Sequence, residues 1–496
     1  MGISKENLNM VLGLKVGWLR QKRQLSLKEL SEKCGLSISY LNEIEKGKKY
    51  PKADKIMALS AALEVGYDQL VSLQLDHQLA PLSELLSSSI LQEIPFEIFG
   101  LSQSDLMDLM TSRPAHFAAL IDTVAKLAKS NDITVDQLLT GALKSYIEMN
   151  GFHFPEIEKK AESFKKNKKW GIRRPDFLTL KRYLEYQYKY SIDTGYLSGR
   201  TLPVHLRSLY LPKKKPRFYL HPSLSDSEKV FETGRQIGYE VLDLHERIST
   251  TALNKQATFD QLINTLQVSV FSSALMIDRK SFTSDISSFF DLTKFENETL
   301  KGLIKKFDVT VEQFFYRLAQ ILTSEFGISQ FYLLKFSLNS KIGKFSLDDE
   351  LHFGRLHDSS GIRDTEHFCR RWISTDLLRQ ASERITGYEN ILTGAQKSKF
   401  LESGIEYLCI SGAQASSVEA NTYSCITLGF VQNDTFLKKV KFADDPQISE
   451  QTVNKTCERC SIEDCNVRAS EPVIYQKEQR LEHLADKINK IYGETL

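Results

Sequence analysis

The stretch LKELSEKCGLSISYLNEIEKGKKYP, from Leu27 to Pro51, decides the fold of the first part of the chain. Apolar residues recur in it at three-to-four spacing, as on the buried side of a helix. We expect Ser31 to stand where two helices cross closely, and Gly35 to occupy a turn with a positive φ. The pattern predicts two short helices joined by a tight turn, a helix-turn-helix. The residues expected to hold one helix on the other are Leu30, Cys34, Leu36, Leu41 and Ile44.

The second helix has side chains that this core does not use. Ser37 precedes it and can accept a hydrogen bond from its first turn. Ile38, Ser39, Asn42 and Glu43 are then expected to face outward, at the N-terminal part of a helix that would enter the DNA major groove. For each of them a second interpretation stays open, in which the side chain contacts only the DNA backbone or solvent.

Over about its first 75 residues the chain resembles the Cro/repressor-type regulators, including the trailing EKGKKYP and the later LSAALEV. The resemblance implies that Ile38, Ser39 and Glu43 reach base edges, whereas Ser37, Tyr40 and Lys48 hold phosphates. Glu43 would accept from a cytosine amino group, and Ile38 would touch a thymine methyl. The alternative is a structural or protein-binding use of the same domain.

Composition sets the broad class of the protein. With 496 residues, 41% hydrophobic and 26% charged, the chain has an ordinary globular composition and room for about three domains. Because the net charge is only +2, any attraction to nucleic acid must come from local patches. Residues 159–174 hold eight Lys and Arg, although such a run is equally typical of a solvated linker. Without a signal peptide or an apolar run of about 20 residues, we expect a cytoplasmic protein.

Three stretches downstream resemble the zinc-peptidase domain of the ImmA/IrrE type. They are FYLHPSLSDSEKVFETGRQIGYEVL at Phe218–Leu242, FSSALMIDRKSF at Phe271–Phe282, and LIKKFDVTVEQFFYRL at Leu303–Leu318. Such domains follow DNA-binding modules in several bacterial regulators. The resemblance implies a mainly helical domain with a zinc site on the helix of the first stretch.

The zinc-binding residues of that family are missing. An active member would carry H-E-x-x-H, two imidazoles one turn apart with a glutamate to activate water. Those positions read Arg235, Gln236 and Tyr239 here, and the downstream acidic ligand aligns near Thr265. Arginine cannot bind zinc and glutamine cannot take a proton from water, so we expect no metal there and no enzyme activity. The nearby His245 has no second histidine four residues on, and we interpret it as a structural or surface residue.

Three of the seven cysteines crowd into nine residues of the segment CERCSIEDCNVRASEP. Cys457, Cys460 and Cys465 have C-x2-C-x4-C spacing, which lets one loop place several thiolates around a metal centre. This segment and HFCRRWIS, around Cys369, resemble the C-terminal domain of short-chain fatty-acyl regulators, which include regulators of propionate and glyoxylate metabolism. The resemblance implies a four-cysteine iron-sulfur cluster (4Fe-4S) with Cys369 as fourth ligand, and sensing of acyl-coenzyme A. A structural zinc, free thiols, and Cys409 as fourth ligand remain alternatives.

The changes in periodicity give the expected fold class and domains. Helical patterns at Phe117–Leu127 and Val135–Tyr146 precede a mixed region with a strand at Arg217–Leu220. Strand patterns follow at Phe331–Ser337, Tyr407–Ser411 and Tyr423–Val431, and helix returns from Pro472. We expect an α+β protein: an all-α helix-turn-helix domain, a mainly helical metallopeptidase-like domain, and a strand-rich α+β domain with the cysteine cluster. The expected boundaries are residues 1–75, a helical linker or dimerisation region 76–174, 175–325, and 326–496.

Together these patterns predict a homodimeric or larger transcriptional regulator that binds a double-stranded DNA operator. The signal would be a short-chain acyl-coenzyme A or the redox state of the cluster. A regulatory peptidase is disfavoured by the missing zinc ligands. The remaining alternative is an antitoxin-like or stress-responsive regulator, in which the degenerate peptidase domain binds a partner protein and the cysteines hold a structural zinc.

Overall fold

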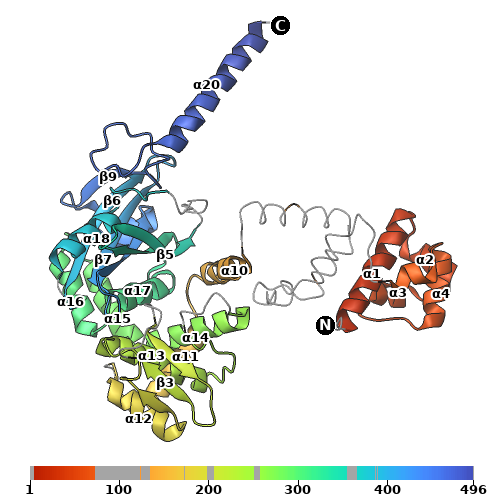
Figure 1. The fold of residues 1–496 in the computed structure, drawn as a ribbon, viewed down its shortest axis with the longest axis horizontal. Coiled ribbons are helices and arrows are strands. Elements are labelled where there is room, and N and C mark those ends of the chain that lie inside the picture. Colours follow the sequence, from red (N-terminus) through yellow and green to blue (C-terminus); the bar gives the residue numbers. More distant parts are fainter. Residues whose placement is uncertain are drawn as a thin grey trace. The chain divides into compact units, whose positions relative to one another are not determined.

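A computed structural model shows a mixed α+β chain with helices at its beginning and strands concentrated near its end, which confirms the expected fold class (Figure 1). The chain divides into two compact units, residues 1–146 with 256–260, and residues 147–255 with 261–496. No described helix is both long and apolar enough to cross a membrane. The structure describes residues 5–72, 105, 123, 134–171, 174–197, 206–250, 257–354, 366–385, 387 and 389–494.

Five short helices build the helix-turn-helix region in the first unit. Their shared core is made of fully buried aliphatic side chains, among them Leu14, Leu30, Leu41, Ile44 and Leu59. This confirms three of the five core residues expected from the sequence, and Cys34 and Leu36 pack against the same core while partly exposed. The helices are α1 (Lys5–Lys22), α2 (Leu27–Cys34), α3 (Ile38–Glu45), α4 (Ala53–Ala62) and α5 (Tyr67–Val71).

The middle of the chain is mainly helical and carries one small sheet. The predicted helix at Val135–Tyr146 lies within α10, and the predicted strand at Arg217–Leu220 is β3. β3 pairs in parallel with β1 (Ser191–Asp193) and antiparallel with β2 (Ser208–Leu211). The predicted helix at Phe117–Leu127 falls outside the described residues. The helices here are α10 (Val135–Met149), α11 (Pro155–Asn167), α12 (Phe177–Gln187), α13 (Asp226–Val241), α14 (Phe259–Met276), α15 (Arg279–Phe290), α16 (Asn297–Phe307) and α17 (Val311–Phe326).

The second sheet has six strands in the order β5-β4-β8-β7-β6-β9. All neighbouring strands are antiparallel except β6 and β9, which run in parallel. The three predicted strand segments lie in β4, β7 and β8 and are confirmed. The bounds are β4 (Phe331–Asn339), β5 (Lys344–Phe353), β6 (Ile391–Phe400), β7 (Glu406–Ala415), β8 (Thr422–Val431) and β9 (Ser449–Val453).

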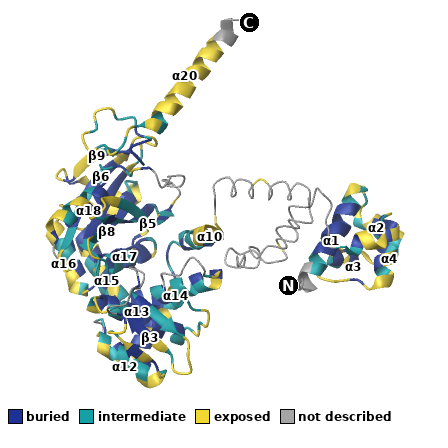
Figure 2. Ribbon diagram, in the orientation of Figure 1, coloured by how far each residue is buried: buried dark blue, intermediate teal, exposed yellow. Residues whose placement is uncertain are grey.

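Helices cover both faces of this sheet. On one face Gly412 of β7 leaves room for α17, because a Cβ there would lie 2.7 Å from the side chain of Val311. On the other face Gly394 of β6 lies against Ile373 of α18 (Ile373–Arg384), where a Cβ would come to 3.1 Å. Glycine is therefore used where a helix packs close to a strand. Most residues of β7 and β8 are buried, and Figure 2 shows the dark blue of β8.

After β8 the chain forms α19 (Asp434–Lys439), a 3-10 turn at Lys441–Asp444, the edge strand β9 and the cysteine loop. It ends in α20 (Val473–Glu494), which confirms the helix expected from Pro472 onward.

Candidate nucleic-acid interface and cysteine loop

Local sequence fixes the geometry of the two motif helices. The Ser26 hydroxyl and the Glu29 carboxylate form a reciprocal capping box at the start of α2. Gly35 ends α2 with φ +69°, which confirms the left-handed turn expected there. The Ser37 Oγ accepts a hydrogen bond from the Tyr40 N–H at 3.3 Å, so Ser37 is the N-cap of α3 as expected. The turn between the helices is therefore set by glycine and serine.

Helix α1 packs closely on α3, and two features fix this contact. A Cβ on Gly13 would lie 2.4 Å from the Ile44 carbonyl oxygen, so only glycine permits this approach. The Arg20 guanidinium forms a bidentate pair with the buried Glu45 carboxylate, with N–O distances of 2.6 and 2.9 Å. Sequence reasoning did not identify Glu45, since a charged residue inside a short amphipathic helix is indistinguishable from a surface residue.

The outward face of α3 holds the predicted base-reading residues together. Ile38 is 48% exposed, an unusual position for a branched apolar side chain, and Ser39 and Asn42 are exposed beside it. Glu43 is half-buried and forms an ion pair with Lys49 at 2.7 Å. Before the Glu43 carboxylate could accept from a base, it would have to share or release this lysine.

A cluster of lysines follows α3 in the chain, and sequence reasoning identified only one of its members, Lys48. The ammonium groups of Lys55 and Lys49 lie 4.5 and 5.7 Å from the centroid of the half-buried Tyr40 ring, as in cation–π contacts. The available signal was the density of lysines between positions 46 and 55. This lysine rim consists of Lys46, Lys48, Lys49, Lys52 and Lys55.

Comparison with known protein families identifies the motif of the first unit. A helix-turn-helix family model matches residues 16–70, so this segment is a helix-turn-helix domain. No curated protein matches the sequence. A solved structure described as a Mycobacterium tuberculosis transcriptional regulator is similar at 14% identity with a TM-score of 0.45, covering 67% of this chain and 93% of that one.

In the second unit the structure brings Cys369 to the cysteine loop, residues 457–468. Backbone hydrogen bonds join Cys369 N–H to the Lys455 carbonyl and Cys457 N–H to the His367 carbonyl, at 3.1 and 2.8 Å. Burial raises the pKa of the Cys369 thiol, and the charges of Cys457 and Cys460 raise it further. Three of the four predicted ligands therefore lie close enough to interact. Cys465 is half-exposed on the same loop, with its N–H bonded to the Glu463 carbonyl.

Ion pairs and main-chain contacts hold the cysteine loop in place. Arg459 pairs with the buried Glu366 at 2.7 Å, and Glu458 with His367 at 2.7 Å. The Arg468 guanidinium donates to the carbonyl oxygens of Cys457 and Ile462. Most of these partners come from the segment before Cys369 or from the loop itself, so the geometry of the thiols is tied to both segments.

The surroundings of the thiols suit a group with negative charge. Arg370 is half-buried, its guanidinium lies 3.9 Å from the centroid of the Phe345 ring, and its Nη1 has no hydrogen-bond partner among the described residues. The thiols of Cys369 and Cys457 are near enough to interact electrostatically with this guanidinium. A guanidinium near cysteines favours their thiolate form, which is the form that binds metals. In the described part of the chain, however, no group of three or more His, Cys, Asp or Glu side chains is arranged to hold a metal ion.

Cys409, the alternative fourth ligand, lies in the core of the sheet. Its thiol sits 3.1 Å from the Tyr332 hydroxyl and 3.5 Å from Ser398 Oγ. Burial raises the pKa of this thiol. The setting matches the buried core thiol that its apolar strand indicates.

The four positions at which the resemblance would place a zinc site lie as follows. The hydroxyls of Tyr239 on α13 and Thr265 on α14 are 3.2 Å apart. Arg235 forms an ion pair with Glu232 on its own helix at 3.1 Å. Gln236 is buried beside them. His245 is exposed, with Asp243 at 3.6 Å, and takes no part in this cluster.

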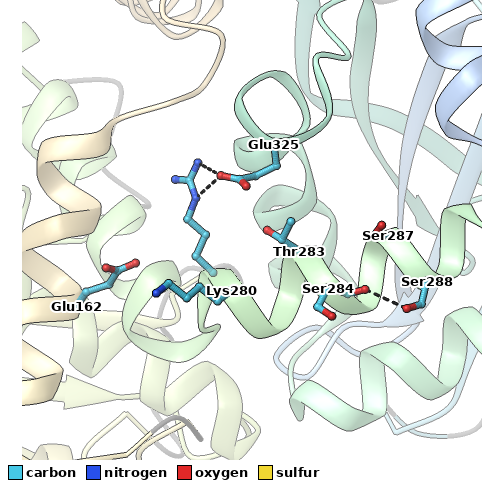
Figure 3. Close-up of a pocket in the computed structure, with 8 residues that line it drawn as sticks. Glu162, Lys280, Thr283, Ser284, Ser287, Ser288 and Glu325 are labelled. Atoms are coloured by element: carbon cyan, nitrogen blue, oxygen red, sulfur yellow. Dashed lines mark hydrogen bonds and ion pairs between the residues drawn. The ribbon is translucent and has the colours of Figure 1, made fainter.

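A polar groove of about 630 Å³ lies along α15 in the second unit (Figure 3). Four hydroxyl side chains of α15 line it together with Arg279. The Arg279 charge is already neutralised, because Glu325 and the buried Glu158 bind it at 2.5 and 3.1 Å. Beneath the groove Glu158 also pairs with the fully buried Arg317 at 2.8 Å. The hydroxyl residues are Thr283, Ser284, Ser287 and Ser288.

Proposed function

We propose that this chain is a sequence-specific transcriptional regulator that binds double-stranded DNA through α3. The observation that carries the proposal is the exposed face of Ile38, Ser39 and Asn42 at the N-terminal end of a capped helix inside a helix-turn-helix domain. Recognition helices place these N-terminal residues against base edges in the major groove. The lysine rim follows α3 directly in the chain and supplies positive charge that phosphates would bind.

The proposed contacts divide by chemistry. Ile38, Ser39, Asn42 and Glu43 read base edges, whereas Tyr40 and Lys48 hold phosphates. Ser37 also belongs to the phosphate group. Its hydroxyl oxygen accepts from the Tyr40 N–H, and its O–H proton would be donated to a phosphate oxygen.

Selection of operators from a random DNA pool by the full-length protein tests this proposal. We expect enrichment of one sequence with two related half-sites, as two copies of the domain would require. The variant Ile38→Glu should enrich nothing, while Met57→Glu, an exposed apolar residue on α4, should enrich the same sequence. Failure of the wild type to enrich any sequence would remove the proposal.

We also propose that the C-terminal half senses a metabolic signal, a short-chain acyl-coenzyme A or the redox state of an iron-sulfur cluster. Cys369, Cys457, Cys460 and Cys465 would hold the cluster. Its support is that backbone hydrogen bonds join the Cys369 segment to the cysteine loop, with the half-buried Arg370 near the thiols.

Anaerobic purification followed by iron, zinc and sulfide analysis tests the cofactor. Iron and sulfide with broad absorption near ~400 nm, lost in Cys457→Ser and kept in Cys34→Ser, would support the cluster. Stoichiometric zinc in a colourless protein would replace it with a structural site. Arg235→Ala should leave the metal content unchanged, because we propose that the degenerate zinc site holds no metal and that the chain has no peptidase activity.

A further inference from the structure

Helix α20 leaves an apolar stripe exposed along its length. Leu481, Leu484 and Ile488 are 57%, 54% and 43% exposed. Every residue from position 476 to 490 is exposed, as the colouring of α20 in Figure 2 shows. A helix of a folded domain normally turns such a stripe toward its own core. None of the described residues covers the apolar stripe of α20.

The spacing of the stripe is that of a coiled coil. Ile474, Leu481 and Ile488 recur every seven residues, and Leu484 stands three residues after Leu481 and four before Ile488. Apolar residues alternating at intervals of three and four form the seam that packs against a second helix of the same kind. The pattern therefore fits a partner helix better than a broad hydrophobic surface.

The charges of α20 select among possible partners. The helix carries four basic and four acidic residues, so it has no net charge. A helix that binds DNA backbone or an acidic membrane surface would carry an excess of Lys and Arg. Two copies of a neutral helix with both signs interspersed do not repel each other, and each can offer the other opposite charges beside the seam.

We propose that α20 pairs with the α20 of a second copy of this chain and so forms a dimer contact separate from the DNA-binding domain. The base of the helix is fixed to the cysteine loop. The Glu458 carbonyl oxygen accepts the N–H groups of Ile474 and Tyr475, both at 3.0 Å. A helix anchored in this way presents the stripe from a defined point of the domain. The proposal does not depend on the DNA-binding function, because the pairing needs no DNA.

Analytical ultracentrifugation of the full chain without DNA tests the pairing. The wild type should be a dimer at about 50 µM, and Leu481→Glu with Leu484→Glu should weaken association by roughly a hundredfold or more, since two apolar pairs are lost and like charges face each other. Both residues are exposed and glutamate favours helix, so the domain should stay folded.

Two controls isolate the stripe. Gln479→Glu with Lys490→Gln makes the same change of charge on the opposite side of α20 and should leave association unchanged. Leu481→Met with Leu484→Met conserves volume and should keep the dimer within a few-fold. A monomeric wild type, or a dimer that survives Leu481→Glu with Leu484→Glu, would overturn the proposal and leave the DNA-binding function untouched.

Discussion

Ile38 and Lys48 differ in chemistry, and their loss should have different effects on DNA binding. Ile38→Ala removes an exposed apolar contact, so it should lower affinity for the selected operator by about 1–3 kcal/mol and leave affinity for scrambled DNA unchanged. Lys48→Ala should weaken binding to both and reduce the slope of log affinity against log salt by about 0.9. Fluorescence anisotropy at several salt concentrations measures both. Identical behaviour of the two variants would show that α3 is not the recognition helix.

The Glu158 carboxylate should be important for the stability of the second unit. Glu158→Gln leaves the fully buried Arg317 with a neutral partner and should cost about 3–5 kcal/mol of unfolding free energy. The control is Glu156→Gln on the same helix, whose exposed pair with Lys159 should contribute less than about 1 kcal/mol. Urea unfolding of the full chain measures the difference, and equal stabilities would contradict this role.

The same carboxylate predicts an acid dependence. Burial opposes ionisation of Glu158, but Arg317 and Arg279 outweigh it and hold its pKa below the usual 4.5. A carboxylate with a lowered folded pKa contributes stability above its unfolded pKa and loses it as the pH falls through the folded value. Stability of the wild type should therefore drop more steeply than that of Glu158→Gln below about pH 4.5. If the stabilities of the two proteins fell in parallel from pH 7 to 3, the ion pairs of Glu158 would not control the acid dependence.

For single residues, the sequence predicted a structural role where that role depends only on local geometry. Gly35 and Ser37 could be assigned because a positive φ and an N-cap depend on a few neighbouring residues. Glu45, Arg317 and Arg370 could not, because their roles depend on partners far along the chain.

Among the elements, the cysteine loop and α20 are joined through Glu458. Because its carbonyl receives two N–H groups from the first turn of α20, a change in the neighbouring Cys457 should loosen that turn. We expect Cys457→Ser to speed amide hydrogen exchange of residues 473–476, and Cys34→Ser, in the first unit, to leave it unchanged. Unaltered exchange in Cys457→Ser would mean that the loop and the helix are independent.

The sequence predicted strands only where apolar and polar residues alternate or where the whole strand is apolar. β4, β7 and β8 are rich in aromatic and β-branched residues, and the sequence predicted them. β6 was missed because its buried face is polar: Gln396 and Ser398 lie inside and bond to each other at 3.0 Å. The Gln396 side chain also binds the Ile373 N–H and the Arg371 carbonyl, so it positions α18. A strand of this kind lacks the regular spacing of apolar residues by which strands are predicted from sequence.

For the whole molecule, the order of helical and strand patterns along the sequence predicted the fold class. It did not predict which segments far apart in the sequence lie side by side. Cys369 reaches the cysteine loop because Phe368 and Thr456 form an isolated antiparallel bridge. No spacing rule links positions 88 residues apart, and Cys369 was assigned by resemblance alone. The domain boundaries and the roles of the individual cysteines stay predictions.

The measurement that tests the central claim most directly is a footprint of the full-length protein on its selected operator. We predict protection of two half-sites, their centres one helical turn of about 34 Å or a multiple apart, and loss of both in Ile38→Glu. Protection that ignores sequence, or that survives Ile38→Glu unchanged, would contradict a regulator that reads DNA through α3.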